Sequence, residues 1–198
     1  MSLSSKEHIL QTAVSLFSKQ GFAAVSMRDL AKAVDMSTAA LYHHFSNKQA
    51  LYLSAVQFAF TKQASAFDAV WQTELPAQEK LRRFVHCFVL VLTKDADFRC
   101  LIQRELLDAD AERMQLLAEG VFFEQFRQLA HVIAQLGMTQ HVHFKALSMI
   151  ALVCNLIQMQ PLSRYLPGWQ AEHEQVDFIA EQVTDLFMNG LKGSEGSI

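Results

Sequence analysis

Chain breakers are scarce in this sequence, which has only 7 Gly, 3 Pro and 3 Cys among 198 residues. Because 51 % of the residues are hydrophobic, the chain is neither disordered nor dominated by loops. Strand signals are also missing, since no run of alternating apolar and polar residues ends at a turn of the Asn-Gly or Asp-Gly type. These absences leave long helices as the main structure and predict an all-α protein.

Disulfides, a secretion signal and a membrane span are not expected either. The three cysteines, Cys87, Cys100 and Cys154, lie in apolar helical stretches, and Met1–Ser5 is polar. We expect a cytoplasmic protein whose cysteines are free, buried thiols. A redox-sensing role for these cysteines is the less favoured alternative. The longest apolar runs, near 84–92 and 149–157, are about half a membrane span, so no membrane contact is predicted.

Charge is distributed unevenly along the chain. The net charge is −3, yet residues 1–48 carry five Lys/Arg against three Asp/Glu, and residues 49–198 carry twelve against seventeen. A basic N-terminal part on a larger acidic body fits contact with nucleic acid at one end only.

Capping patterns place the first four helices. Ser4–Glu7, Ser26–Asp29 and Ser46–Gln49 each have the spacing of a capping box, and Ser37 is a further N-cap candidate. Gly21 supplies a residue suited to end the first helix. The helices are predicted at 5–20, 27–33, 38–44 and 48–70, and two short helices between two longer ones are typical of a helix-turn-helix module.

About nine helices are predicted in all, with the remaining five at 77–94, 97–107, 111–136, 142–160 and 172–190. Pro76 begins the first of these, Gly137 ends the long central helix, and Pro161 with Pro167-Gly168 ends the next. The predicted domains are a helix-turn-helix DNA-binding domain at 1–48, an effector-binding and dimerisation helical bundle at 49–192, and a disordered tail at 193–198.

Apolar residues at helical spacing predict a small three-helix core in the N-terminal domain. The three helices contribute, in order, Ile9, Ala13, Leu16 and Phe17; Leu30, Ala31 and Val34; Leu41 and Phe45. This core explains why the segment folds, and it says nothing yet about DNA.

The third helix carries the functional prediction. At about 100° per residue, Thr38, Ala39, Tyr42 and His43 share one face, while Ala40 and Leu41 point the other way. A hydroxyl, a methyl, a phenol and an imidazole suit the major groove better than they suit a merely solvated face. Lys48 lies in the first helical turn that follows, where the helix dipole disfavours a cation, so a DNA phosphate is its expected partner.

Residues 8–55 resemble the DNA-binding domain of the TetR/AcrR family. The matching segments are Ile9–Phe17, Gly21-Phe22, Ser26–Ala31, Ala33–Ser37, Leu41–Phe45 and Lys48–Leu51. Two positions depart from the family pattern: Asp35 stands in the turn where Gly is usual, and Ala39 replaces a Gly near the start of the recognition helix. Asp tolerates the left-handed conformation, so we expect the turn to survive.

The resemblance implies roles for individual residues of the DNA-binding face. Ser26 caps the second helix and touches phosphate, Arg28 reaches a base edge, and Ser37 and Lys48 contact phosphates. Facing the bases or nearby backbone is the role implied for Thr38, Ala39, Tyr42 and His43. His44 is expected either to pack within the domain or to form a hydrogen bond with a phosphate. Packing against the fourth helix is the alternative for Tyr42 and His44, and solvated surface is the alternative for Thr38, His43 and Lys48.

The last two helices are apolar enough to suggest a partner, and the resemblance implies a four-helix dimer interface there. The interface residues predicted are Phe144, Leu147, Ala151, Val176, Ile179, Val183 and Phe187. Packing within one chain is the alternative. A dimer would present two recognition helices about 34–36 Å apart, or a multiple, and would therefore read an approximately palindromic operator.

The middle helices are rich in soft apolar side chains, and the whole chain has 15 Phe and 8 Met. The resemblance implies a cavity for a small effector that releases DNA. The candidate lining is Phe84, Phe88, Phe122, Phe126 and Met149, with Arg104 and Asn155 to orient a ligand. Ordinary core packing is the alternative for each of these residues.

Enzyme chemistry is not predicted. His141 and His143 form a pair with no Cys or carboxylate at metal-ligand spacing, and His173-Glu174 lacks the second His of a zinc protease helix. No cofactor, metal or catalytic residue is expected. The sequence thus predicts a ligand-responsive repressor that binds a palindromic operator as a homodimer, with a helical bundle that has lost DNA binding as the competing interpretation.

Overall fold

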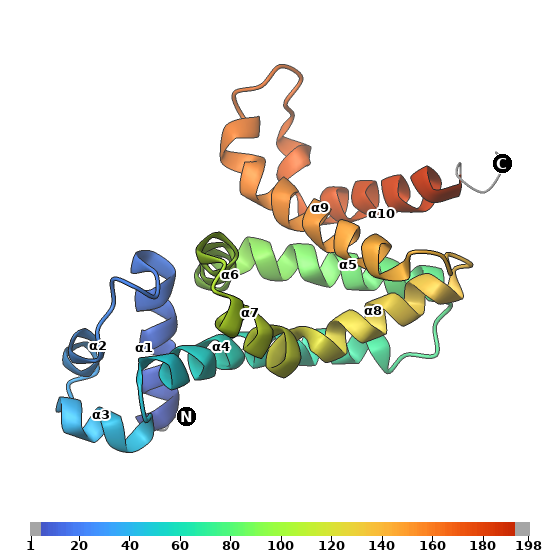
Figure 1. Ribbon diagram of the computed structural model, residues 1–198. Coiled ribbons are helices and arrows are strands. Elements are labelled where there is room, and N and C mark those ends of the chain that lie inside the picture. The colour runs from blue at the N-terminus through green and yellow to red at the C-terminus, as the bar shows by residue number, and fades with distance from the viewer. Residues whose placement is uncertain (1–4, 193–198) are drawn as a thin grey trace. The chain divides into compact units, whose positions relative to one another are not determined.

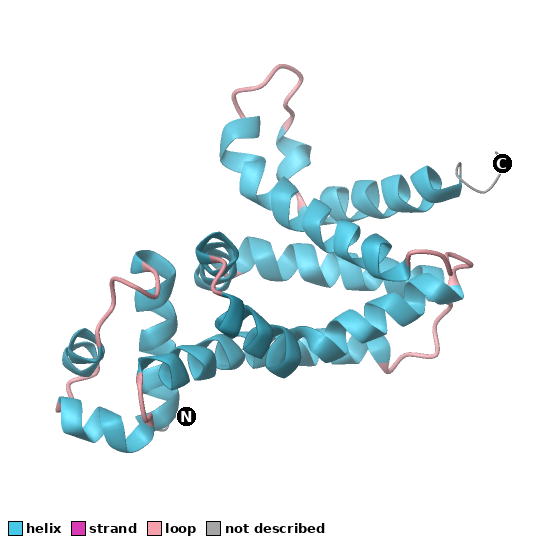
Figure 2. Cartoon of the chain, viewed as in Figure 1, coloured by secondary structure: helices cyan, strands magenta, loops and turns pink. Residues whose placement is uncertain are grey.

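The computed structural model describes residues 5–192, and all of its regular structure is helical (Figure 2). The prediction of an all-α fold is therefore confirmed over these residues. They divide into two compact units, one made of the residues up to Ala64 together with Asp95–Phe123, the other of Ser65–Lys94 together with the residues from Glu124 onward. The capping box expected at Ser4 and the tail expected at 193–198 lie outside the described residues.

The first unit begins with the helices that the capping patterns predicted. They are α1 (Ser5–Gln20), α2 (Met27–Ala33), α3 (Thr38–His44) and the first part of α4 (Lys48–Trp71) (Figure 1). The three-helix core is confirmed, because Ile9, Ala13, Phe17, Leu30 and Leu41 are completely buried. Gly21 has φ of +82° and donates its N–H to the Phe17 carbonyl at 2.9 Å, which ends α1 as expected.

Two later helices complete this unit. These are α6 (Ala96–Asp108), which packs along α1, and α7 (Ala111–Leu117). Asp95 and Asp110 cap them, accepting the backbone N–H groups of Phe98 and Arg113 at 2.9 Å each. The compact unit that holds the DNA-binding helices thus extends beyond the predicted boundary at residue 48.

The helix predicted at 111–136 is interrupted by a π turn. Ala118–Phe122 forms this turn around Gly120, and α8 (Phe123–Gln135) continues from it. Glycine lowers the stability of regular helix, which makes it a suitable site for such a bulge. With α7, the π turn and α8 counted as one segment, residues 5–192 contain the nine helical segments expected, plus one short 3-10 turn at Ala171–Glu174.

The second unit contains the end of α4, α5 (Ala77–Lys94), α8, α9 (Val142–Ser163) and α10 (Val176–Lys192). α10 and α9 both pack on α5 (Figure 1). Two side-chain pairs join α5 to α10 at the surface: Arg82 to Asp185 and His86 to Asp177, each at 2.9 Å.

Three predicted helix ends are corrected. Pro161 lies inside the last turn of α9, which continues to Ser163. Ala171–Glu174 forms a 3-10 turn, so α10 begins at Val176 and not near 172. The cap of α4 is Asn47 and not Ser46, because the Asn47 side chain accepts the Ala50 N–H at 2.8 Å.

The helix α9 has unusual apolar surface. By length and composition alone it could cross a membrane, although only 22 % of its most apolar stretch is buried inside the chain. The prediction from short apolar runs did not anticipate this. Phe144, Leu147, Met159 and Leu162 are among its exposed side chains, so much of the apolar surface of α9 is not covered within the chain.

Candidate DNA-binding surface

The surface begins at the cap of α2. The Ser26 Oγ accepts the Asp29 N–H at 3.1 Å, and the Asp29 carboxylate accepts the Ser26 N–H at 3.0 Å, which confirms the predicted capping box. The Ser26 hydroxyl also donates to the Asp29 carboxylate, and this hydrogen bond, followed by the one from the Ser26 N–H, holds the pKa of the Asp29 carboxyl below its usual value. Arg28, the next residue predicted to touch DNA, is exposed beside this cap.

The turn between α2 and α3 keeps its geometry without glycine. Asp35 has φ of +53°, the left-handed conformation that the resemblance required at this position. Ser37 then caps α3, since its Oγ accepts the Ala40 N–H at 3.1 Å. The start of the recognition helix is therefore set by a capped turn.

The outward face of α3 is open. Leu41 is completely buried and anchors the helix, while Ala39, Tyr42, His43 and His44 are exposed, Tyr42 to 49 %. Thr38 is half-buried at the edge of this face. The exposure of Tyr42 argues against the alternative that it packs on the fourth helix. His44 keeps a tilted ring contact with Phe45, with 6.4 Å between the centroids.

Lys48 has a partner inside the chain. Its Nζ donates to the Phe22 carbonyl oxygen at 2.9 Å and lies 4.3 Å from the centroid of the Phe22 ring. This contact explains a cation in the first turn of α4, which was attributed to DNA phosphate from the sequence alone. Lys48 is half-buried, and two of its three N–H donors are left by this single hydrogen bond.

The residues predicted to form an effector cavity are divided between the two units. Phe122 contacts Phe60 in the first unit, with ring centroids 5.1 Å apart. In the second unit Phe84 and Phe88 stack at 5.9 Å, Phe126 lies against His143 at 5.1 Å, and Met149 is completely buried. Only Phe84 and Phe88 are thus shown in direct contact with each other.

Two of the candidate ligand-binding residues are corrected. Arg104 is not directed at a cavity, because its guanidinium donates to the Ser18 and Lys19 carbonyl oxygens at 2.7 and 2.6 Å, at the end of α1. Asn155 is exposed, and its side-chain amide donates to the Ala151 carbonyl of the preceding turn at 2.8 Å. Both were chosen as polar groups in apolar sequence, and both satisfy backbone carbonyls instead.

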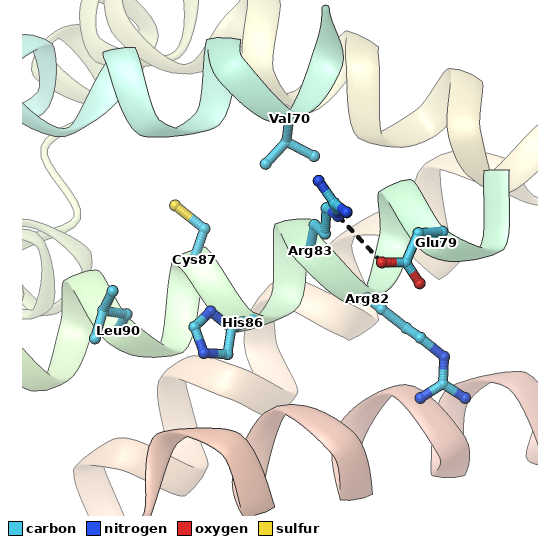
Figure 3. Close-up of a pocket in the computed structure, with 7 residues that line it drawn as sticks. All are labelled: Val70, Glu79, Arg82, Arg83, His86, Cys87 and Leu90. Atoms are coloured by element: carbon cyan, nitrogen blue, oxygen red, sulfur yellow. Dashed lines mark hydrogen bonds and ion pairs between the residues drawn. The ribbon is translucent and has the colours of Figure 1, made fainter. Parts of the chain in front are cut away.

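A hollow of about 480 Å³ lies elsewhere on the second unit (Figure 3). Its lining residues are Val70, Glu79, Arg82, Arg83, His86, Cys87 and Leu90. Arg83 pairs with Glu79 at 3.1 Å across one helical turn. This set of residues is not among those predicted from the sequence, although Glu79, Arg83 and His86 recur at the i, i+4, i+7 spacing that places side chains on one helix face.

The predicted dimer residues also need correction. Ile179, Val183 and Phe187 are buried within the chain, where α10 packs along α5, so they belong to the core. Phe144, Leu147 and Ala151 of α9 are exposed, Val176 is half-buried, and Leu186 is an exposed apolar residue of α10. The alternative of packing within one chain therefore applies to α10 and not to this face of α9.

An exposed recognition helix, capped at its start and held on a buried three-helix core, defines a helix-turn-helix DNA-binding module. Residues 9–55 match the family described as bacterial regulatory proteins, tetR family. Through these residues the chain carries the DNA-binding domain of the TetR family of bacterial regulatory proteins.

Curated relatives share this N-terminal part. The helix-turn-helix regulator YerO of Bacillus subtilis is 43 % identical over 53 residues, which are 27 % of this chain and 18 % of that protein. The biofilm operon negative transcriptional regulator IcaR of Staphylococcus aureus is 36 % identical over 55 residues, 28 % of this chain and 30 % of IcaR. The matched segment thus spans less than a third of either relative.

Solved structures share the whole fold. The fatty acid degradation regulator FadR of Bacillus halodurans has a TM-score of 0.77 at 16 % identity, covering 97 % of this chain and 98 % of its own. FadR of Bacillus subtilis, solved in complex with stearoyl-CoA, has a TM-score of 0.76 at 16 % identity and covers 92 % and 97 %. Identities this low establish the fold of the helical body and leave its ligand open.

Proposed function

We propose that the protein is a DNA-binding transcriptional repressor that binds a palindromic operator as a homodimer and is released by a small apolar or amphipathic effector. The observation that carries this proposal is the exposed face of α3, where Ala39, Tyr42 and His43 lie above the buried Leu41. A major groove admits one helix, and such groups pair with base edges or the thymine methyl. Repression is favoured by IcaR, which is named a negative regulator.

Contacts on this surface fall into two kinds. Thr38, Ala39, Tyr42 and His43 face bases or the adjacent backbone, with Arg28 at a base edge. Ser26, Ser37, His44 and Lys48 contact phosphates and fix the register of α3 in the groove. The Ser37 hydroxyl accepts a hydrogen bond from its own helix and retains its donor for a phosphate oxygen. The Ser26 hydroxyl donates to the Asp29 carboxylate, so this donor has to be redirected when Ser26 contacts a phosphate.

A homodimer formed through α9 is the second element of the proposal. Phe144, Leu147 and Ala151 lie at i, i+3 and i+7 on one exposed stripe of α9. Apolar stripes with this spacing pair with a second helix in bundle interfaces. An exposed apolar surface of this extent is costly in water, and a second copy would cover it.

The effector is the third element. FadR of Bacillus subtilis was solved with stearoyl-CoA, an amphipathic molecule. The second unit of this chain has many soft aromatic side chains, including Phe67, Phe84 and Phe88 in mutual contact, which can rearrange around an apolar ligand. A repressor released in this way acts where the DNA is, in the cytoplasm.

A gel-shift assay tests the proposal. The full chain is titrated against the DNA directly upstream of its own gene and against a scrambled duplex of equal length, at low and at moderate salt. Specific binding that exceeds binding to the scrambled duplex supports a regulator. Equal, weak binding to both duplexes would instead favour a helical bundle without operator recognition.

An enzyme is the competing class. A regulator is favoured because residues 9–55 match the tetR family of regulatory proteins, and residues 5–192 contain no group of three or more His, Cys, Asp or Glu placed to hold a metal ion. Metal analysis of the purified protein provides an independent test, since a stoichiometric metal would contradict the proposal that the protein is only a regulator.

A further inference from the structure

The turn between α1 and α2 holds an aromatic ring between two cations. The Lys48 Nζ lies 4.3 Å from the Phe22 ring centroid, and the Arg113 Cζ lies 4.4 Å from the same centroid. The ring also meets Tyr52 edge-on at 5.1 Å. All four residues belong to the first compact unit. Phe22 is thus the point at which α4 and α7 both contact the segment that leads into the DNA-binding helices.

Arg113 is held in place by a buried carboxylate. Its Nε donates to Glu105 Oε1 at 3.0 Å, and both residues are almost completely buried. The Tyr52 hydroxyl donates to the other oxygen of Glu105 at 2.6 Å. Burial, followed by the hydrogen bond to Glu105, raises the pKa of Tyr52 well above its usual value, so the hydroxyl stays a donor.

A buried ion pair is stable only when its partners are well placed and their remaining polar atoms are satisfied. Here Glu105 has two donors, Tyr52 and Arg113, and Arg113 also lies 3.5 Å from the carboxylate of Asp108. The guanidinium therefore has one defined position over the Phe22 ring. A surface arginine would contact the ring only part of the time.

The helix α6, which carries Glu105, also contacts the end of α1. Arg104 donates to the Ser18 and Lys19 carbonyl oxygens, and its Nη1 would lie 3.5 Å from a Cβ at Gly21. The Ser18 hydroxyl donates to Asp97 at 2.8 Å. The segment from Ser18 to Phe22 thus has its carbonyls, its turn and its ring all contacted from α6 and α7.

We infer that Arg113 and Glu105 are positioning residues for DNA binding, which act through Phe22 on Lys48 and on the turn that leads to the α2 cap. The inference rests on the proposed function. Arg113 is 7 % exposed, so it holds the ring while Lys48 faces the phosphate. Two cations on one ring couple α7 to the first turn of α4, because a shift of the ring changes both contacts.

Measurement of affinity for the upstream duplex, with thermal melting alongside, tests the inference. The double variant Arg113→Met with Glu105→Gln removes the ion pair without leaving a buried unpaired charge. We expect about tenfold weaker binding, which corresponds to the loss of one defined cation contact, with a cooperative melt retained. Arg127→Met with Glu124→Gln is the matched control, since it removes the same two charges from an exposed ion pair, and it should change affinity less than twofold.

A double-mutant cycle separates positioning from general stability. Lys48→Met should weaken binding strongly in the wild-type chain and much less in the Arg113→Met, Glu105→Gln chain, because Lys48 has already lost its position there. Additive effects, or affinity that falls only in step with melting temperature, would overturn the inference while leaving the proposed function intact. If the wild-type chain does not bind its upstream duplex, both the inference and the proposed function are overturned.

Phe22 provides a second, independent pair of variants in case the double variant fails to fold. Phe22→Tyr keeps the ring and should bind DNA within twofold of wild type. Phe22→Leu keeps apolar volume but removes the ring from both cations, and should bind about tenfold more weakly. Equal affinity of the two variants would overturn the inference.

Discussion

Lys48 contributes to the fold through Phe22 and is also the phosphate contact that we propose. Its ammonium group lies at a helix N-terminus, where the macrodipole disfavours it. The Phe22 carbonyl and ring compensate for this within the chain. Because the hydrogen bond to Phe22 uses one donor, the remaining donors are available to a phosphate, and the contact orients them.

The first prediction concerns Lys48 and Tyr42. Lys48→Ala should weaken DNA binding about tenfold and lower the slope of log K against log salt by about one unit, because one phosphate contact is lost. Tyr42→Ala should weaken binding and change the slope little, since its phenol is neutral.

Quantitative gel shifts at several salt concentrations measure both effects. Lys62→Ala is the control, because Lys62 is exposed on the same helix as Lys48 but lies 14 positions further along the chain. If Lys48→Ala and Lys62→Ala reduce the slope equally, the assignment of Lys48 to a phosphate is wrong.

The second prediction concerns thiol reactivity. Burial raises the pKa of Cys154 to about 11, so about one thiol in a thousand is ionised at pH 8. Native protein should therefore react with iodoacetamide at this position far more slowly than unfolded protein, and the rate should rise tenfold per pH unit between 8 and 10. Peptide mass spectrometry after timed alkylation measures the rate; fast native labelling at pH 8 would contradict the buried environment.

At the scale of the helix, capping decides whether α3 forms. A helix of seven residues has little intrinsic stability, and its first N–H groups need acceptors. Ser37 supplies one for Ala40, and Asn47 does the same for Ala50 of the next helix.

The third prediction follows from these caps. Ser37→Ala should lower the free energy of unfolding by about 1 kcal/mol. Ser46→Ala should have a smaller effect, because Asn47 and not Ser46 caps α4. Urea denaturation followed by circular dichroism compares the two variants, and a larger loss for Ser46→Ala would contradict the observed cap.

The fourth prediction concerns the exposed stripe of α9. Phe144 is 69 % exposed in the single chain, so Phe144→Glu should leave the protomer folded. The same substitution should place a charge in the proposed dimer interface, where an unpaired carboxylate is costly, and the protein should become monomeric.

Analytical ultracentrifugation gives the mass of each variant. Leu107→Glu is the control, since Leu107 is 81 % exposed but lies on α6. A Phe144→Glu variant that sediments like wild type would exclude α9 from the interface.

At the scale of the whole molecule, the proposed DNA-binding unit is a pair of chains. One α3 contacts only a few base pairs, which gives little specificity, and a symmetric dimer doubles the contacts and requires a palindrome. The spacing of the half-sites is then a geometric property of the dimer.

The fifth prediction uses this spacing. Insertion of five base pairs between the half-sites should rotate one of them to the opposite side of the duplex and reduce affinity at least a hundredfold. Insertion of about ten base pairs returns both half-sites to the same side of the duplex but leaves them further apart. It should therefore restore little of the affinity unless the dimer can separate its two recognition helices. Gel shifts on the three duplexes measure the affinities. If the five-base-pair insertion leaves the affinity unchanged, each helix-turn-helix module binds its half-site independently.

Much of the N-terminal fold was predictable because its signals are local. A capping serine and the backbone N–H that donates to it are three residues apart, as Ser26 and Asp29 show, and an apolar stripe repeats within one helix. The bounds of α1, α2 and α3 therefore agree with prediction. The exposure of Tyr42 followed from the same periodicity, with Leu41 on the opposite face.

The errors arose where the partner of a residue is distant in sequence. Ile179, Val183 and Phe187 read equally well as interface or core, and only the packing of α10 on α5 places them in the core. Arg104 looked like a ligand-binding group until its partners at Ser18 and Lys19, more than 80 positions away, were known. Pro161 lies in a final helical turn that continues only to Ser163, which periodicity does not reveal.

Sequence alone therefore determined the helical class, the bounds of the DNA-binding helices and the face of α3 that points outward, because these depend on contacts within a few residues. Tertiary structure decided which apolar faces are covered, and it brought Phe22, Lys48, Glu105 and Arg113 into one cluster. The physical reason is that burial and ion pairing depend on which helices lie side by side, and many arrangements are compatible with the same periodic pattern.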